Sequence, residues 1–211
     1  MDILAELLRK RLVVPASRVE RERRTVPSGL CELDRVAGGG LPAGAISEVV
    51  APSCGGATVL YAALAGATSR GEVAAVVDPG EGFDVASAHA AGVALEHLLW
   101  VRPRGSFARV LRALERILST GGFGMVALDL GWDCGDAPGA RAVPAAWMRI
   151  RRLAMACGAV VLVVSPRPRV GTFASLAVGV ARRRAHWSGR GSKERWLERI
   201  ELSFDLRRKK C

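Results

Sequence analysis

The stretch AISEVVAPSCGGATVLYAALAGATSRGEVAAVVDP, residues 45–79, sets out a strand, a glycine-rich loop, a helix and a second strand. Residues 45–50 form an apolar run that ends before Pro52, and an apolar helical segment extends from about Thr58 to Ser69 and is stopped by Gly71. Residues 72–77 form the next apolar strand, which Asp-Pro-Gly closes. Apolar strands that alternate with helices are typical of a parallel sheet covered on both faces.

The same alternation continues along the chain and predicts an α/β fold with one largely parallel sheet. Further strands are expected at residues 98–101, 124–130, 159–164, 175–185 and 197–206. Asp84 and Ser106 are placed to cap the helices that follow them, and Pro144 is suited to the first turn of a third. The two late strands are expected to be antiparallel, with alternating apolar side chains in the second.

The first 24 residues differ from the rest and predict an N-terminal arm. Residues 2–12 have the spacing of a short amphipathic helix, and a charged linker follows Pro15. The apolar stripe is too small to fold alone, so it must dock on its own core, on a like subunit or on a partner. Its candidate partner-binding residues are Ile3, Leu4, Leu7 and Leu8. We therefore divide the chain into an arm (1–24), a core (25–206) and a basic tail (207–211).

Composition excludes several classes of protein. Half of the 211 residues are hydrophobic, so disorder of the whole chain is excluded. No apolar run reaches the length of a membrane-spanning helix, and the opening MDILAELLRKR lacks the features of a signal peptide. The five cysteines are scattered, with no spacing that indicates a disulfide framework or a metal site. We expect a cytoplasmic protein without membrane contact and without a bound metal.

The net charge of +11 is distributed unevenly. Residues 25–101 hold two basic and eight acidic residues, whereas the chain from residue 141 onward is net +13. Arginine supplies 27 of the 31 basic residues and suits phosphate and carboxylate recognition better than lysine. Two interpretations fit this split: one basic face for an anionic partner, or a solvated surface in an arginine-rich proteome.

The loop of residues 51–58, APSCGGAT, has the position and length of a phosphate-binding P-loop but lacks its charge. The P-loop pattern GxxxxGK[ST] needs glycines for close backbone approach, a lysine for the phosphates and a hydroxyl for magnesium. Gly56 and Thr58 match the second glycine and the hydroxyl, whereas Ala51 occupies the first glycine position and Ala57 the lysine position. Phosphoryl transfer depends on electrostatic stabilisation, so this substitution predicts that ATPase activity is absent.

Residues 25–50, TVPSGLCELDRVAGGGLPAGAISEVV, resemble the start of the RecA recombinase core. The residues that carry the resemblance are Gly29, Leu33, Asp34, Gly38, Gly39, Gly40, Leu41, Pro42, Gly44 and Glu48. The resemblance covers about residues 25–205 and implies a RecA-like P-loop core. It places the family's catalytic glutamate position at Gly80 and its Walker B aspartate at Asp129. The vestigial nucleotide site is then Gly55, Gly56, Ala57, Thr58, Gly80 and Asp129.

Two families resemble RecA without its ATPase: ImuA, an accessory of damage-inducible mutagenesis, and SulA, which blocks division by binding FtsZ. The long basic C-terminal half favours ImuA. That resemblance implies a non-catalytic, cofactor-free accessory of SOS-induced error-prone translesion synthesis at the bacterial nucleoid. The implied partners are a RecA-type recombinase, an ImuB-like protein, an error-prone polymerase and single-stranded DNA. The alternatives are a SulA-like division inhibitor and a weak residual ATPase that uses Thr58 and Asp129.

The C-terminal region combines basic residues with two tryptophans, Trp187 and Trp196. A cationic track with stacking aromatics is typical of a surface that binds single-stranded DNA. The candidate DNA-binding residues are Arg182, Arg183, Arg184, Arg190, Lys193 and Arg195. The structural alternative is that Trp196 packs beneath the edge strand. Two further basic surfaces, on the helices after Ser106 and Pro144, are either solvated faces or docking sites for an acidic partner segment.

Overall fold

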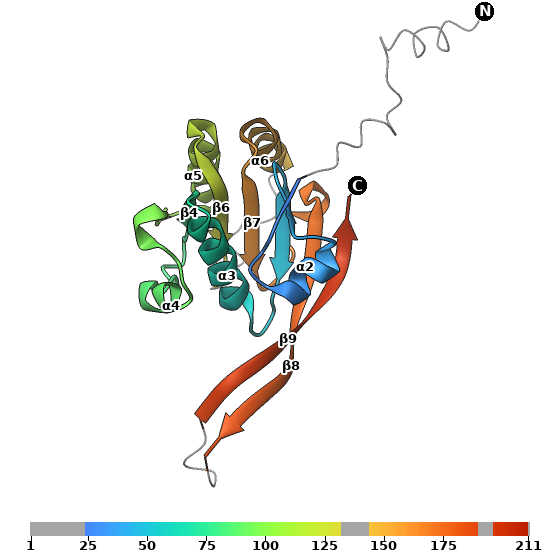
Figure 1. Cartoon of the computed structure of the whole chain (residues 1–211). Helices are drawn as coiled ribbons and strands as arrows, with labels where there is room; N and C mark the ends of the chain where they lie inside the picture. The colour runs from blue at the N-terminus through green and yellow to red at the C-terminus, as the bar shows by residue number, and fades with distance from the viewer. Residues whose placement is uncertain (1–23, 132–143, 190–195, 211) are drawn as a thin grey trace, which may run out of the picture.

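A seven-stranded sheet with the order β5-β4-β6-β7-β3-β8-β9 forms the centre of the protein (Figure 1). The computed structural model describes residues 24–131, 144–189 and 196–210. The strands of this sheet are β3 (Ile46–Val50), β4 (Val73–Val77), β5 (Leu98–Val101), β6 (Phe123–Asp129), β7 (Val160–Ser165), β8 (Leu176–Ser188) and β9 (Trp196–Lys209). All neighbouring strands pair in parallel except β8 and β9, which are antiparallel.

Helices cover both faces of this sheet (Figure 1). One face packs against α2 (Cys31–Ala37), α3 (Gly56–Ser69) and α4 (Val85–Ala90), and the other against α5 (Phe107–Thr120) and α6 (Pro144–Cys157). Successive residues of β7 enter different cores: Leu162 faces α3, while Val161 and Val163 face α5 and α6. Burial on both faces explains why these strands are continuously apolar.

Short elements complete the described chain. They are β1 (Thr25–Val26), β2 (Leu41–Pro42), η2 (Leu95–His97) and η3 (Gly171–Phe173). The strands β1 and β2 pair with each other beside the main sheet. The predicted N-terminal helix, with Ile3, Leu4, Leu7 and Leu8, lies outside the described residues.

The predicted strands and long helices are confirmed, with differences at their ends. Asp84 caps α4 by accepting the backbone N–H of Ser87 at 2.9 Å. Ser106 occupies the N-cap position of α5, but its side chain makes no capping hydrogen bond. The sequence pattern does not predict α2, because residues 29–34 resemble a turn. In the structure, Leu33 and Ala37 are the buried residues of this helix.

The parallel pairing of β8 with β3 follows from the ten-residue connection 166–175. This segment crosses the sheet face that carries α6, and Val170 and Ala174 are fully buried there. It returns the chain to the start of β3, where the N–H of Ser175 donates to the carbonyl of Ile46 at 2.8 Å. Only β9 therefore runs antiparallel, which refines the expectation for the two late strands.

Glu48, in the middle of β3, holds this crossover in place. Its side chain is 2% exposed. One carboxylate oxygen accepts the backbone N–H groups of Arg169 and Val170, the latter at 2.8 Å. A buried carboxylate is tolerated when hydrogen bonds replace its hydration, so Glu48 links the sheet to the connection through backbone donors.

Glu48→Ala is expected to lower the free energy of unfolding by about 2–4 kcal/mol, because it leaves two backbone N–H groups without their acceptor. Glu48→Gln keeps an acceptor oxygen and should lose less. Urea unfolding followed by circular dichroism measures both, with Glu32→Ala as the control, since Glu32 is exposed and pairs with the exposed Arg35. Equal midpoints for Glu48→Ala and Glu32→Ala would contradict this role.

Candidate functional site

The loop of residues 51–55, between β3 and α3, forms one wall of a pocket of about 250 Å³. The pocket lies where β3, β6 and β7 end, which is where ligands bind in parallel α/β sheets. Its lining includes four residues of the vestigial nucleotide site: Gly55, Gly56, Ala57 and Asp129. The structure therefore brings most of the predicted site together, and we call this hollow the loop pocket.

The loop pocket has no cationic side chain among its described lining residues. Asp129 supplies a carboxylate, and burial raises its pKa, an effect that a hydrogen bond from the N–H of Gly131 at 2.8 Å partly offsets. Burial also raises the pKa of Tyr61, another lining residue. Among the described lining residues, a bound phosphate would thus meet an acidic group and no lysine or arginine to balance its charge.

Thr58 and Gly80, the other two residues of the vestigial nucleotide site, do not line the loop pocket. Thr58 lines a separate groove, so the hydroxyl and the carboxylate of Asp129 are not brought to one pocket. The carboxylate beside Gly80 belongs to Glu81, which forms ion pairs with Arg104 at 3.0 Å and Arg102 at 3.9 Å.

Asp78 fixes the turn that carries Gly80 and Glu81. Its carboxylate is buried and accepts the backbone N–H groups of Gly82 and Phe83 at 3.2 and 2.9 Å. The indole N–H of Trp100 donates to the same group at 3.3 Å. Asp78 therefore has a structural role in this turn.

The base of the β8–β9 hairpin covers the loop at Gly55. Gly55 has a φ of +90°, a conformation that favours glycine. A Cβ atom built there would lie 2.9 Å from side-chain carbons of Leu202 in β9 and Val180 in β8. A side chain at this position would therefore force the side chains of Val180 and Leu202 to shift, so the loop packs directly against the base of the hairpin.

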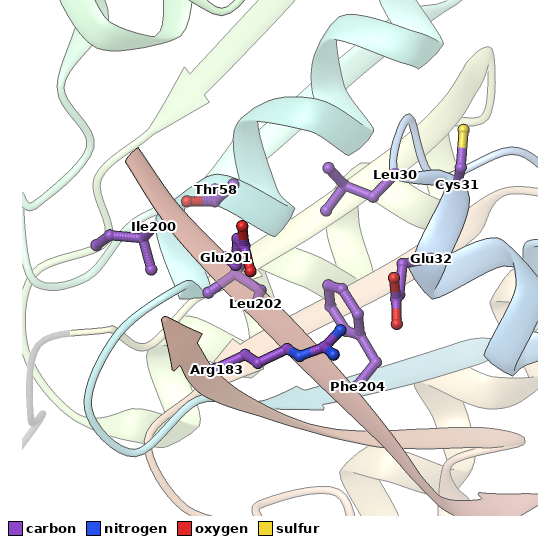
Figure 2. Close-up of a pocket in the computed structure, with 9 residues that line it drawn as sticks. All are labelled: Leu30, Cys31, Glu32, Thr58, Arg183, Ile200, Glu201, Leu202 and Phe204. Atoms are coloured by element: carbon purple, nitrogen blue, oxygen red, sulfur yellow. The ribbon is translucent and has the colours of Figure 1, made fainter. Parts of the chain in front are cut away.

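A groove of about 370 Å³ lies between the hairpin and the two nearest helices (Figure 2). Figure 2 shows its lining: Leu30, Cys31, Glu32, Thr58, Arg183, Ile200, Glu201, Leu202 and Phe204. The sequence pattern does not predict this groove. The alternation of residues 200–206 indicates one apolar face on β9, but it does not reveal that this face lies opposite α2.

Residues 181–188 and 196–202 continue away from the sheet as a two-stranded projection, which we call the ribbon and whose base at Leu202 packs against the core (Figure 1). A register shift at Arg183 pairs Arg182 with Leu202 and Arg184 with Glu201. Because these two partners are consecutive in β9, Arg182 and Arg184 lie on opposite faces. Without the shift, simple alternation would have placed both arginines on the same face.

The tip of the ribbon exposes apolar side chains. Trp187 is 50% exposed and Trp196 is 59% exposed, so Trp196 does not pack beneath the edge strand. Trp187 pairs with Leu197 and Trp196 with Ser188, which places the two tryptophans on opposite faces. Each face of the ribbon therefore carries one tryptophan and at least one arginine.

The other three candidate DNA-binding residues, Arg190, Lys193 and Arg195, lie outside the described residues.

Other classes of site receive no support from the described residues. In this part of the chain, no group of three His, Cys, Asp or Glu side chains is arranged to hold a metal ion. None of the described helices combines the length and apolar character needed to cross a membrane.

Comparisons with known proteins relate the chain to one family. The model of the RecA N-terminal domain matches residues 9–131. Protein RecA from Lactobacillus delbrueckii subsp. bulgaricus is 35% identical over 114 residues, which is 53% of this chain and 34% of that protein. The corresponding values are 33% over 106 residues (50% and 30%) for Picosynechococcus sp. and 36% over 116 residues (54% and 30%) for Prochlorococcus marinus. The chain thus matches about a third of the length of these curated relatives.

Asp129→Asn is expected to stabilise the protein at neutral pH and to have little effect near pH 3. Since the pKa of Asp129 is raised above its ordinary value of 3.8, its contribution to stability falls as the pH rises through and above that value. Asparagine stays neutral and can still accept from Gly131. Thermal unfolding should show a gain of a few degrees at pH 7, since about 1 kcal/mol shifts the Tm by about 2–4 °C in a domain of this size. A gain of equal size at both pH values would contradict this explanation.

Proposed function

Since the chain belongs to the RecA N-terminal domain family, we propose that it is a non-catalytic RecA-like accessory protein of SOS-induced error-prone translesion DNA synthesis. In this proposal it binds single-stranded DNA through the ribbon and acts at the bacterial nucleoid with protein partners. The observation that carries the proposal is a RecA-like frame whose nucleotide pocket has Ala57 in the place of the cation.

The loop pocket supports a non-catalytic role on electrostatic grounds. Catalysis of phosphoryl transfer requires cationic groups or metal ions at the transferring phosphate. Asp129 contributes the opposite charge, and Thr58 lies in another groove. Backbone N–H groups at the start of α3 can still favour an anion, but they supply far less stabilisation than a lysine with magnesium.

The ribbon supports binding to single-stranded DNA. Its exposed tryptophans offer flat surfaces on which bases can stack, and the arginines at 182–184 can contact the phosphates. Because both faces carry these groups, a strand would have to pass around the ribbon and could not lie along one face. Stacking tolerates any base, so the proposed binding does not depend on sequence.

The proposed protein partners follow from the family and from the resemblance to ImuA. They are a RecA-type recombinase, an ImuB-like protein and an error-prone polymerase. Co-purification of a tagged chain from DNA-damaged cells tests this part of the proposal. Recovery of FtsZ without the other three would replace it with a SulA-like role in cell division.

The variant Arg182→Ala/Arg183→Ala/Arg184→Ala is expected to bind single-stranded DNA more weakly than the wild type. If all three arginines contact phosphates, the slope of log K against log salt should fall by about 2, at roughly 0.7 per contact. Trp187→Ala should weaken binding by about 1–3 kcal/mol through lost stacking. Fluorescence anisotropy with a labelled poly-dT oligonucleotide measures both.

The charge-matched control is Arg109→Ala/Arg112→Ala/Arg116→Ala, which removes three exposed arginines from α5. This control should keep the wild-type affinity and salt slope, because α5 lies on the sheet face opposite α3. If both triple variants lost affinity equally, binding would depend on total charge and the ribbon would not be the DNA surface.

A further inference from the structure

The helices α5 and α6 present a strongly basic surface that the proposed function does not use. They pack side by side on the sheet face opposite α3 (Figure 1). Together they contain six arginines and one acidic residue, Glu115. The arginines are Arg109, Arg112, Arg116, Arg149, Arg151 and Arg152.

An open groove of about 350 Å³ lies between the two helices. It is lined by Arg112, Glu115, Arg116, Ser119 and Leu153, and we call it the arginine groove. Leu153 is partly buried and packs against the apolar core beneath α5 and α6. The groove therefore combines an apolar contact point with arginines on the exposed side of α5.

Glu115 does not neutralise these arginines, because it is already paired. Its carboxylate accepts from two nitrogens of Arg149, Nη2 at 2.9 Å and Nε at 3.0 Å. Within the part of the chain that the structure describes, no other carboxylate pairs with Arg112, Arg116 or Arg152. These exposed guanidinium groups are thus available for an anionic partner.

We propose that the arginine groove docks an acidic protein segment that carries an apolar side chain for Leu153. Arginine binds carboxylates through two parallel hydrogen bonds, and clusters of arginine recognise acidic motifs. Arg112 and Arg116 lie about 6 Å apart along the helix axis. This spacing matches carboxylates two residues apart in an extended segment, or four apart in a helix.

A nucleic acid fits this surface less well than an acidic segment. The described surface of the two helices has no exposed aromatic side chain on which a base could stack, in contrast to the ribbon. The apolar contact at Leu153 would have no partner in a phosphodiester chain.

The test uses a fluorescein-labelled peptide of about 12 residues in which glutamates alternate with leucines. Fluorescence anisotropy should show saturable binding that Arg112→Glu/Arg116→Glu weakens at least tenfold. Replacing the leucines of the peptide by serine should also weaken binding. Glu115→Gln should tighten it, because the substitution releases Arg149 for the peptide.

The control is Arg182→Ala/Arg183→Ala/Arg184→Ala, which should bind the peptide as the wild type does. Because Arg112 and Arg116 are exposed, circular dichroism and the Tm should show that their variant is folded. Peptide binding that Arg112→Glu/Arg116→Glu leaves intact, or the absence of binding by the wild type, would overturn the proposal. Loss of poly-dT binding in this variant, with peptide binding unchanged, would assign the groove to nucleic acid instead.

Discussion

The contact between the loop after β3 and the base of the hairpin determines how the parts of this protein fit together. Gly55 adopts a positive φ, and Val180 and Leu202 occupy the space that a side chain at this position would need. The loop is therefore packed against β8 and β9, close to the point where the hairpin continues as the exposed ribbon.

Two groups that nucleotide chemistry would use line different hollows. Asp129 lines the loop pocket, whereas Thr58 lines the groove beside β9. Because Ala57 occupies the lysine position, the loop pocket has no described cation to hold a triphosphate. Clusters of exposed arginines lie instead on the ribbon and on the α5–α6 surface, and the exposed Trp187 and Trp196 lie on the ribbon. These features agree with our proposals that the protein acts by binding and that it uses separate surfaces for DNA and for an acidic segment.

The sequence predicted the sheet well because burial on both faces leaves a clear apolar signal in every central strand. The P-loop-like spacing after β3 predicted a nucleotide-type loop at this edge of the sheet, and the structure brings Gly55, Gly56, Ala57 and Asp129 to one pocket there. The sequence did not predict that Arg182 and Arg184 lie on opposite faces, since the register shift at Arg183 depends on pairing with β9. It also missed α2, whose seven residues bury only Leu33 and Ala37 and so show little periodicity.

The most direct test of whether the loop pocket is catalytically inactive is the steady-state rate of magnesium-ATP hydrolysis. The rate is measured for the purified chain with saturating poly-dT. If the pocket is inactive, the wild-type chain should hydrolyse ATP no faster than the Asp129→Ala variant does. Calorimetry should then show no saturable heat of ATP binding. Turnover that scales with protein concentration and disappears in Asp129→Ala would contradict this, because it would mean that the loop pocket catalyses phosphoryl transfer without the lysine.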